Sequence, residues 1–317
     1  MTEIHVQLPG LLTTVQDLGR EGFGPMGVSP SGAADPISLR LGNRLLGNAD
    51  GSAALEMTLL GGTFLFPQGA VVALTGSDFA ATLDGVPLEL WTSVEVSPGQ
   101  TLRLRHTRSG ARCYLCVQGG IAVEPFLGSA STHILSGLGG FEGRALRKGD
   151  VLNTGPTAGS FRKLKLAQQG WGPLAPRQIL RVTPGPQAHW FPESSQQMFY
   201  RSRYRVTEES NRMGLRLVGP HLNGPIPTGF AAEMVTEGVS LGAIQVPHGG
   251  LPIILFVEQQ TTGGYRKIAN VIFADLPSLG QLRPRDEIRF ELVGWEEARR
   301  LLLEQETLLA AKELIVE

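Results

Sequence analysis

Residues 80–90 read Ala80-Ala81-Thr82-Leu83-Asp84-Gly85-Val86-Pro87-Leu88-Glu89-Leu90, two short runs that flank an Asp-Gly pair. Asp-Gly is favoured in the two-residue turn of a β-hairpin, because both central residues of that turn adopt a positive φ. The stretch therefore predicts two antiparallel strands. Glycine and proline, with 41 and 21 residues in a chain of 317, divide the rest of the sequence into similar short segments.

Short apolar runs continue on both sides of this hairpin. Residues 71–74 and 253–257 are continuously apolar, whereas residues 102–105 and 288–292 alternate apolar and charged side chains. Alternation is typical of a strand with one buried face. Many short runs separated by turns favour strands over helices. The sequence therefore predicts a mainly β protein built from barrels or sandwiches.

Two helices stand out against this background. Asp35-Pro36 has the residue types of an N-cap followed by a first helical position, and Gly47 can end the helix that follows. One face of this helix carries Ile37, Leu41 and Leu45. A second helix is predicted from Trp295 to about Leu314, with acidic residues in its first turn and a leucine stripe.

The length of the chain indicates about two domains. Glutamine, glycine and proline concentrate in residues 168–176, as in a linker. We therefore expect an N-terminal domain over residues 1–170 and a C-terminal domain over residues 171–317.

Composition excludes several classes of partner. Acidic and basic residues nearly cancel, giving a net charge of −1, and neither sign forms long runs. Binding to nucleic acid or to an anionic membrane is therefore not expected. No signal-peptide pattern and no apolar stretch of about 20 residues are present. We expect a soluble, cytoplasmic protein.

The two cysteines form a C-x-x-C spacing at Cys113 and Cys116. This spacing occurs in redox and zinc sites. However, residues 111–117 are rich in strand formers, and side chains three apart on a strand point to opposite faces. A zinc site would also need a second ligand pair. We therefore expect two core thiols and no metal site.

A first polar cluster lies in residues 8–22. Thr14, Gln16, Asp17 and Arg20 combine a hydroxyl, an amide, a carboxylate and a guanidinium beside glycines. Such loops often bind ligands, and Arg20 has the geometry to hold a carboxylate or to pair with Asp17. Ser31, at the entry to the first helix, is a further candidate because a helix N-terminus attracts anions.

A second cluster occupies the C-terminal half. Glu237 and Gln245 offer the acceptor and donor that a lactam or urea group requires. The loop Thr261-Thr262-Gly263-Gly264 adds two hydroxyls to a backbone that a ligand can approach closely. We expect this loop to line a pocket shared with Glu237 and Gln245.

Arg212 is the remaining candidate, as a clamp for an anionic ligand. The alternative for Arg212 is a surface ion pair with Glu208 or Glu209. Asp17 and Glu237 are the candidate catalytic carboxylates, able either to move a proton or to orient a ligand N–H group. No P-loop and no nucleophile elbow are present in the sequence.

Several segments, in order along nearly the whole chain, carry a family resemblance. They are residues 13–20, 27–35, 43–48, 55–58, 119–121, 139–150, 209–214, 237–247 and 261–269. The chain resembles the allophanate hydrolase subunit 2 family, whose members are also called the C subunit of 5-oxoprolinase. Departures from the family pattern are Ala130 for Arg, Glu258 for Asp, Arg266 for Pro and Arg285 for Gly.

The resemblance implies two cyclophilin-like β-barrel domains and a role in an ATP-dependent 5-oxoprolinase, which opens a lactam to glutamate. It implies partners similar to the B and A subunits of 5-oxoprolinase, with ATP used by the complex. The same family includes the carboxyltransferase lobe of urea carboxylase, which would act with biotin, and a non-catalytic antagonist of a histidine-kinase inhibitor. The residues alone leave all three functions open.

Overall fold

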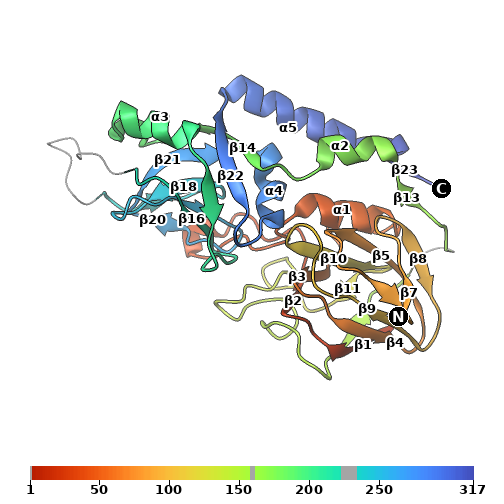
Figure 1. Cartoon of the computed structure of the whole chain (residues 1–317). Coiled ribbons are helices and arrows are strands. Elements are labelled where there is room, and N and C mark those ends of the chain that lie inside the picture. Colours follow the sequence, from red (N-terminus) through yellow and green to blue (C-terminus); the bar gives the residue numbers. More distant parts are fainter. Residues whose placement is uncertain (1, 158–160, 223–233) are drawn as a thin grey trace. The chain divides into compact units, whose positions relative to one another are not determined.

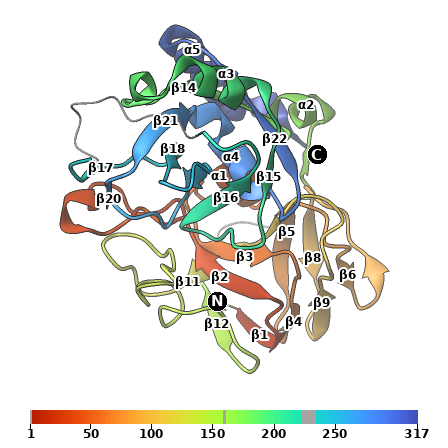
Figure 2. The ribbon, with the colours of Figure 1, turned by 60° about the vertical axis from the view of Figure 1, so that its left-hand side comes forward.

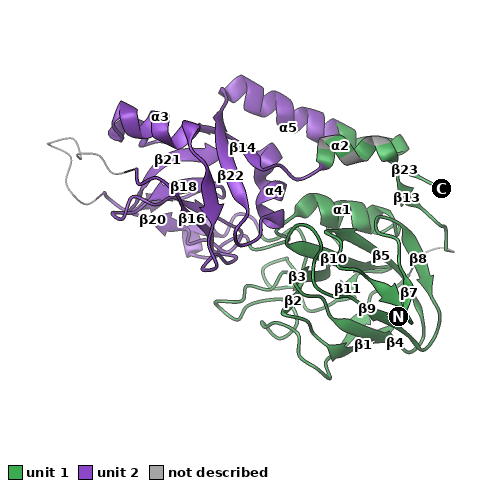
Figure 3. Ribbon diagram, in the orientation of Figure 1, with its two compact units in different colours: residues 1–20, 31–174, 308–317 green, residues 21–30, 175–307 purple. Residues whose placement is uncertain are grey.

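The computed structural model describes residues 2–157, 161–222 and 234–317. The chain forms two compact units, each assembled from separate stretches of sequence (Figure 3). Unit 1 contains residues 1–20, 31–174 and 308–317, and unit 2 contains residues 21–30 and 175–307. One passage between units, after residue 174, lies near the expected domain boundary. Three further passages, after residues 20, 30 and 307, have no counterpart in that expectation.

Unit 1 is built from antiparallel sheets (Figure 1). The larger sheet has the spatial order β11 (Ile121–Ala122), β12 (Val151–Thr154), β1 (Glu3–Leu8), β4 (Thr63–Phe66), β9 (Gln100–Arg103), β6 (Thr82–Leu83) and β7 (Val86–Pro87). The second has the order β2 (Leu12–Gln16), β3 (Ala54–Thr58), β10 (Arg112–Val117), β5 (Ala70–Gly76) and β8 (Ser93–Val96). A two-stranded ladder joins β13 (Lys165–Leu166) to β23 (Ile315–Val316).

The two larger sheets share one apolar core. Ile4 of β1 and Phe64 of β4 lie in the same buried cluster as Leu55 of β3 and Leu74 of β5, and all four side chains are fully buried. Because both sheets contribute to this cluster, they pack face to face.

The hairpin at residues 82–87 is confirmed. Leu83 is paired with Val86 across the turn. Asp84 and Gly85 have φ values of 47° and 87°, as the two central residues of a primed turn require.

The first predicted helix is confirmed as α1 (Pro36–Arg44). Asp35 is its N-cap, and its carboxylate accepts hydrogen bonds from the Ser38 backbone N–H at 3.1 Å and the Ser38 hydroxyl at 2.6 Å. Ile37 and Leu41 are buried in a cluster with Leu309, as the predicted apolar face requires.

Unit 2 contains a closed barrel, seen from a second direction in Figure 2. Its strands follow the order β14 (Ile179–Pro184), β21 (Arg266–Val271), β18 (Ala243–Val246), β19 (Ile253–Leu255), β16 (Gly214–Val218), β15 (Tyr204–Val206) and β22 (Glu287–Leu292). The parallel pair β14 and β22 closes the ring, and the other pairs are antiparallel. A separate ladder joins β17 (Glu237–Gly238) to β20 (Thr262–Gly263). The expected mainly β fold is confirmed.

Apart from the 16-residue α5, the helices in the described residues are short. The remaining α-helices are α2 (Trp171–Leu174), α3 (Glu193–Arg201), α4 (Leu276–Gln281) and α5 (Trp295–Ala310). The 3-10 turns are η1 (Gly24–Met26), η2 (Gln168–Gly170), η3 (Ala188–Trp190), η4 (Phe273–Asp275) and η5 (Lys312–Leu314). The prediction that the last helix reaches Leu314 was wrong, because Ala311 adopts an extended conformation with ψ 129°. No helix in the described ranges is long and apolar enough to cross a membrane.

The two thiols are free and fully buried on β10. Cys113 lies in the core between the two large sheets, whereas Cys116 lies in a separate cluster with Leu39 of α1. The predicted divergence of the two side chains is therefore confirmed. Burial raises the pKa of both thiols, which keeps them protonated.

Candidate functional site

The strongest candidate site lies in unit 2, where the β17–β20 ladder meets the barrel. Glu237 is paired with Gly263, and Gly238 is paired with Thr262. The Val239 N–H extends this ladder by donating to the Thr261 carbonyl at 3.1 Å. The structure thus brings together two predicted segments that are more than 20 residues apart.

Two barrel strands place a second pair of polar side chains in the same region. Gln245 of β18 and Lys267 of β21 are opposite each other in the antiparallel register. Both side chains are buried. The Lys267 ammonium reaches the Glu237 carboxylate, with Nζ 2.6 Å from Oε1. Lys267 is only 3% exposed, whereas the Glu237 side chain is 44% exposed, so the pair runs from the interior to the surface.

Gln187, at the N-terminal cap of η3, completes the contacts of this pair. Its Nε2 donates to Glu237 Oε1 at 2.8 Å, and its Oε1 accepts from the Lys267 backbone N–H at 3.1 Å. The ion pair with Lys267, followed by the Gln187 hydrogen bond, holds the pKa of the Glu237 carboxyl below its usual value. Glu237 is therefore an ionised hydrogen-bond acceptor at neutral pH.

The Gln245 amide is satisfied at one end only. Its Oε1 accepts from Gln260 Nε2 at 3.2 Å. Its Nε2 is buried and has no hydrogen-bond partner among the described residues. Gly263 lies against this nitrogen, because a Cβ added there would be 2.5 Å from it. A buried amide N–H without a partner is costly, so this donor marks a place where a ligand acceptor would be stabilised.

Arg212 lies elsewhere in unit 2. Its Nε is 2.5 Å from Glu258 Oε1, and the two side chains are 5% and 3% exposed. The alternative of a surface ion pair with Glu208 or Glu209 is therefore wrong. A guanidinium engaged in a buried ion pair is poorly placed to clamp a ligand.

The polar cluster of unit 1 is organised around Asp17. Its Oδ1 accepts from the Gly19 N–H at 2.7 Å and from the hydroxyls of Ser129 and Ser131 at 2.6 and 2.5 Å. Its Oδ2 accepts from the Ala130 N–H at 2.7 Å. Four donors on one carboxylate fix the loop over residues 129–131 against the end of β2.

The other predicted site residues of unit 1 form hydrogen bonds in and around residues 126–132. Gln16 Nε2 donates to Thr14 Oγ1 at 3.0 Å and to the Thr132 carbonyl at 3.1 Å, and the Ser31 hydroxyl donates to that carbonyl at 2.7 Å. Arg20 is 2% exposed and donates to the carbonyls of Phe126 and Ser131. These carbonyl contacts hold the Arg20 guanidinium in the interior of unit 1.

Sequence reasoning missed three members of the unit 2 cluster. Lys267 lies within the segment that carries the family resemblance, so its position next to the predicted loop was a usable signal. Gln260 directly precedes Thr261 and had the same signal, whereas Gln187 had none. Gln187 is brought in by η3, whose packing against β21 links residues 80 positions apart.

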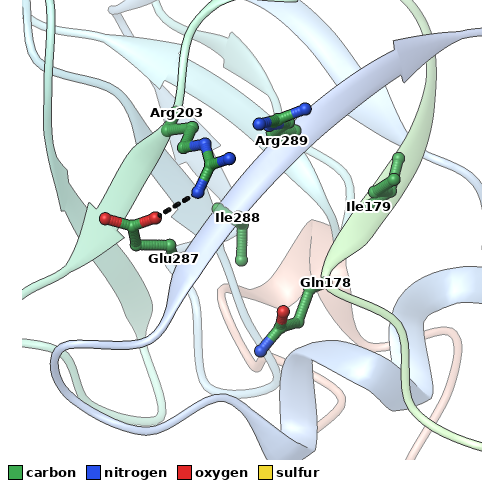
Figure 4. Close-up of a pocket in the computed structure, with 6 residues that line it drawn as sticks. All are labelled: Gln178, Ile179, Arg203, Glu287, Ile288 and Arg289. Carbon is green, nitrogen blue, oxygen red and sulfur yellow. Dashed lines mark hydrogen bonds and ion pairs between the residues drawn. The ribbon is translucent and has the colours of Figure 1, made fainter.

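Two hollows lie away from these clusters. One, of about 300 Å³ in unit 2, is lined by Gln178, Ile179, Arg203, Glu287, Ile288 and Arg289 (Figure 4). The Arg203 guanidinium there is paired with Glu287 at 3.0 Å. The other, of about 550 Å³ in unit 1, is lined by Arg162, Lys163, Lys165 and Glu317. Neither contains a predicted site residue.

Within the described residues, no group of three or more His, Cys, Asp or Glu side chains is arranged to hold a metal ion.

Comparison with known proteins agrees with the resemblance read from the sequence. A family model described as "Carboxyltransferase domain, subdomain A and B" matches residues 26–292. The C subunit of 5-oxoprolinase from Escherichia coli strain K12 is 39% identical over 297 residues, which cover 94% of this chain and 93% of that protein. The C subunit of the Haemophilus influenzae 5-oxoprolinase is 38% identical over 296 residues, with 93% of each chain covered.

Among solved structures, the urea amidolyase of K. lactis is similar with a TM-score of 0.88 at 31% sequence identity. The match covers 99% of this chain and 21% of that much longer protein. The family model, the relatives and the fold agree along most of the sequence, and the chain belongs to the carboxyltransferase domain family, subdomain A and B.

Proposed function

We propose that this chain is a subunit of a cytoplasmic, ATP-dependent 5-oxoprolinase, in which it helps to open the lactam 5-oxoproline to glutamate. Two relatives named as the C subunit of 5-oxoprolinase, matched over more than nine tenths of both chains, support this function. The observation that carries it at the level of residues is the buried Gln245 N–H donor against Gly263, whose partner in the ladder is the ionised acceptor Glu237.

These residues have the chemistry to recognise an amide. Gln245 Nε2 would donate to the lactam carbonyl oxygen, and the Glu237 carboxylate would accept from the ring N–H. Thr261 and Thr262 would border the bound ring. The lowered pKa of Glu237 favours orienting the ring nitrogen over moving a proton, because a weak base is a poor proton acceptor.

ATP supplies the driving force in this proposal, since phosphorylating the lactam oxygen would make the ring carbon open to attack. Arg20 and Arg212, the two cations expected to meet a phosphate, are both engaged in buried contacts. The sequence has no P-loop. We therefore assign nucleotide handling to partners that resemble the B and A subunits of 5-oxoprolinase, and amide recognition to this chain.

The test is to reconstitute the complex from this chain and the two partner subunits, and to omit each component in turn. We expect 5-oxoproline-dependent release of ADP from the full set, and almost none without this chain. Full activity without this chain would falsify the subunit role. Full activity from this chain alone would refute its dependence on partners.

The match to the K. lactis urea amidolyase favours one alternative, a carboxyltransferase lobe that acts on urea or a related amide with carboxybiotin. Urea presents the same N–H and carbonyl groups, so Glu237 and Gln245 would suit it as well. Urea-dependent loss of the carboxyl group from carboxybiotin on a carrier protein, without any response to 5-oxoproline, would favour this alternative.

A further inference from the structure

We infer that Lys267 and Gln187 are positioning residues, which fix Glu237 beside Gln245 so that the site takes the N–H and C=O edge of a cis amide. The inference rests on the proposed function for the identity of the ligand. The contacts of the three side chains are independent of that function. A site of this kind excludes an N-methylated amide, because the nitrogen of that amide has no hydrogen to donate to Glu237.

The burial of Lys267 is the first argument. The Lys267 ammonium is 3% exposed and therefore loses most of its hydration. Its Nζ lies 2.6 Å from Glu237 Oε1. Buried ion pairs of this kind seldom add net stability, since apolar residues of similar volume often serve as well. The pair is better explained by what it does to Glu237, whose side chain remains 44% exposed to a ligand.

The orientation of Gln187 is the second argument. Its carbonyl end is held by the Lys267 backbone N–H, so its NH₂ end must face the carboxylate. Both recorded donors to Glu237, Gln187 Nε2 and Lys267 Nζ, meet the same oxygen, Oε1. Within the part of the chain that the structure describes, Oε2 is thus left available as an acceptor.

The third argument is the shape of the amide edge. A lactam holds its N–H and its carbonyl oxygen on one side of the ring, so its recognition requires an acceptor and a donor side by side. Glu237 is paired with Gly263, and Gln245 Nε2 lies directly against that glycine. Residues directly opposite each other in an antiparallel pair project their side chains to the same face, so Glu237 and Gln245 Nε2 share the face of the ladder at Gly263, which has no side chain to intervene.

The charge near Glu237 is well defined. Lys267 of β21 faces the carboxylate, and Gln187 of η3, which also faces it, is neutral. The neighbouring Arg266 is directed elsewhere, since its guanidinium lies over the Phe191 ring with 4.6 Å to the centroid. Replacing Lys267 thus removes the cation that forms an ion pair with the Glu237 carboxylate.

The first experiment follows the titration of Glu237 in the purified full chain by NMR, using carbon-13 at the glutamate carboxyls. The Glu237 signal is identified by its loss in Glu237→Gln. We expect its midpoint to move to higher pH in Lys267→Met, to move in the same direction in Gln187→Leu, and to stay unchanged in Lys148→Met, a matched change at an exposed lysine. An unchanged midpoint in Lys267→Met would overturn the positioning role.

The second experiment tests the amide edge on the same chain, with 2-pyrrolidinone and N-methyl-2-pyrrolidinone as probes. The Gln245 side-chain NH₂ signals are identified by their loss in Gln245→Leu. Their chemical shifts should change on addition of 2-pyrrolidinone and stay unchanged on addition of N-methyl-2-pyrrolidinone. Equal responses to both probes, or no response to either, would refute the inferred specificity. The exposed Gln197→Leu is the control for an unspecific loss of a glutamine.

A third measurement uses the reconstituted complex. Lys267→Met and Gln187→Leu should raise the KM for 5-oxoproline roughly tenfold, as expected when a charge-assisted contact is weakened, with a smaller change in kcat. Loss of kcat with an unchanged KM would contradict the positioning role. If the wild-type complex ignores 5-oxoproline, the proposed function fails, while the two NMR experiments still decide the inference.

Discussion

Individual side chains show how far a local pattern can mislead. Asp17, beside Gln16 and Arg20, has the composition of a binding loop. Its carboxylate is instead occupied by donors from residues 129–131, more than 110 positions along the chain. Nothing in residues 8–22 indicates those partners. The sequence predicts which residues are polar and clustered, but not what satisfies them.

Replacing Asp17 with Ala should therefore destabilise unit 1. Four donors lose a charged acceptor, and the expected loss is about 3 kcal/mol of unfolding free energy. Urea denaturation measures it. The exposed Glu89→Ala is the control and should stay within about 0.5 kcal/mol of wild type. An Asp17→Ala variant as stable as wild type, but inactive in the complex, would contradict the structural role and favour the predicted catalytic one.

Arg285 offers the opposite change. Its φ of 76° lies in the left-handed region. This conformation costs a residue with a Cβ about 1 kcal/mol or more. The ion pair with Glu208, at 2.9 Å, joins two exposed side chains and contributes little.

Arg285→Gly should thus raise the unfolding free energy by about 1 kcal/mol. Arg285→Ala also removes the ion pair but keeps the Cβ, so it should bring no gain. Thermal and urea denaturation of both variants separate the two effects. Equal stability of the Gly and Ala variants would show that φ is not the cause.

Strands and helices were easier to predict than the contacts between them. The hairpin at Asp84-Gly85 and the capped start of α1 depend on residues that are close in sequence, and both were correct. The final helix was predicted four residues too long, because Leu314 continues the apolar pattern past its end and is buried from a 3-10 turn. The β17–β20 ladder, two residues on each side, is too short to leave a pattern.

The buried pair of Arg212 and Glu258 links the segment before β16 to the segment before β20. Arg212→Met alone should cost about 3–5 kcal/mol, because it leaves a carboxylate buried without this cation. The double variant Arg212→Met, Glu258→Leu should recover much of that loss. A double-mutant cycle of unfolding free energies measures the coupling. Additive losses would mean that the pair does not interact.

The contact between β21 and β17 predicts a pH dependence. The Glu237 pKa is lowered in the folded chain, so its ionised form stabilises the fold above the unfolded pKa, which is near 4.5. That contribution is lost as the pH falls through the lowered folded value. The unfolding free energy of wild type minus that of Lys267→Met should therefore decrease between neutral and acidic pH, whatever its sign at pH 7. Urea denaturation at pH 7, 5 and 3.5 tests the trend, and a difference that increases in acid would contradict it.

At the scale of the molecule, the chain passes between its two units four times. Composition indicated two domains and placed one passage close to residue 170. It could not show that residues 308–317 return to unit 1, because this return depends on contacts between Leu309 or Leu314 and residues far upstream such as Ile37 and Leu41. Neither unit is therefore a single continuous segment.

A fragment of residues 1–174 should consequently be less stable than the same fragment joined by a flexible linker to residues 308–317. The tail supplies β23, which pairs with β13, and buries Leu166 together with Leu309. Thermal unfolding and resistance to protease compare the two. A linked tail carrying Leu309→Asp and Leu314→Asp is the control and should give no benefit. Equal stability of all three chains would show that the tail is dispensable.

The burial of both cysteines has a practical consequence for labelling. The sequence contains no thiols other than Cys113 and Cys116, and both are enclosed in unit 1. A maleimide dye added to the native chain should find no accessible target, so a single cysteine introduced at an exposed position such as Gln197 would carry the fluorophore alone. The arrival of each partner protein could then be followed as a change in the emission or tumbling of one dye, without first removing the native cysteines.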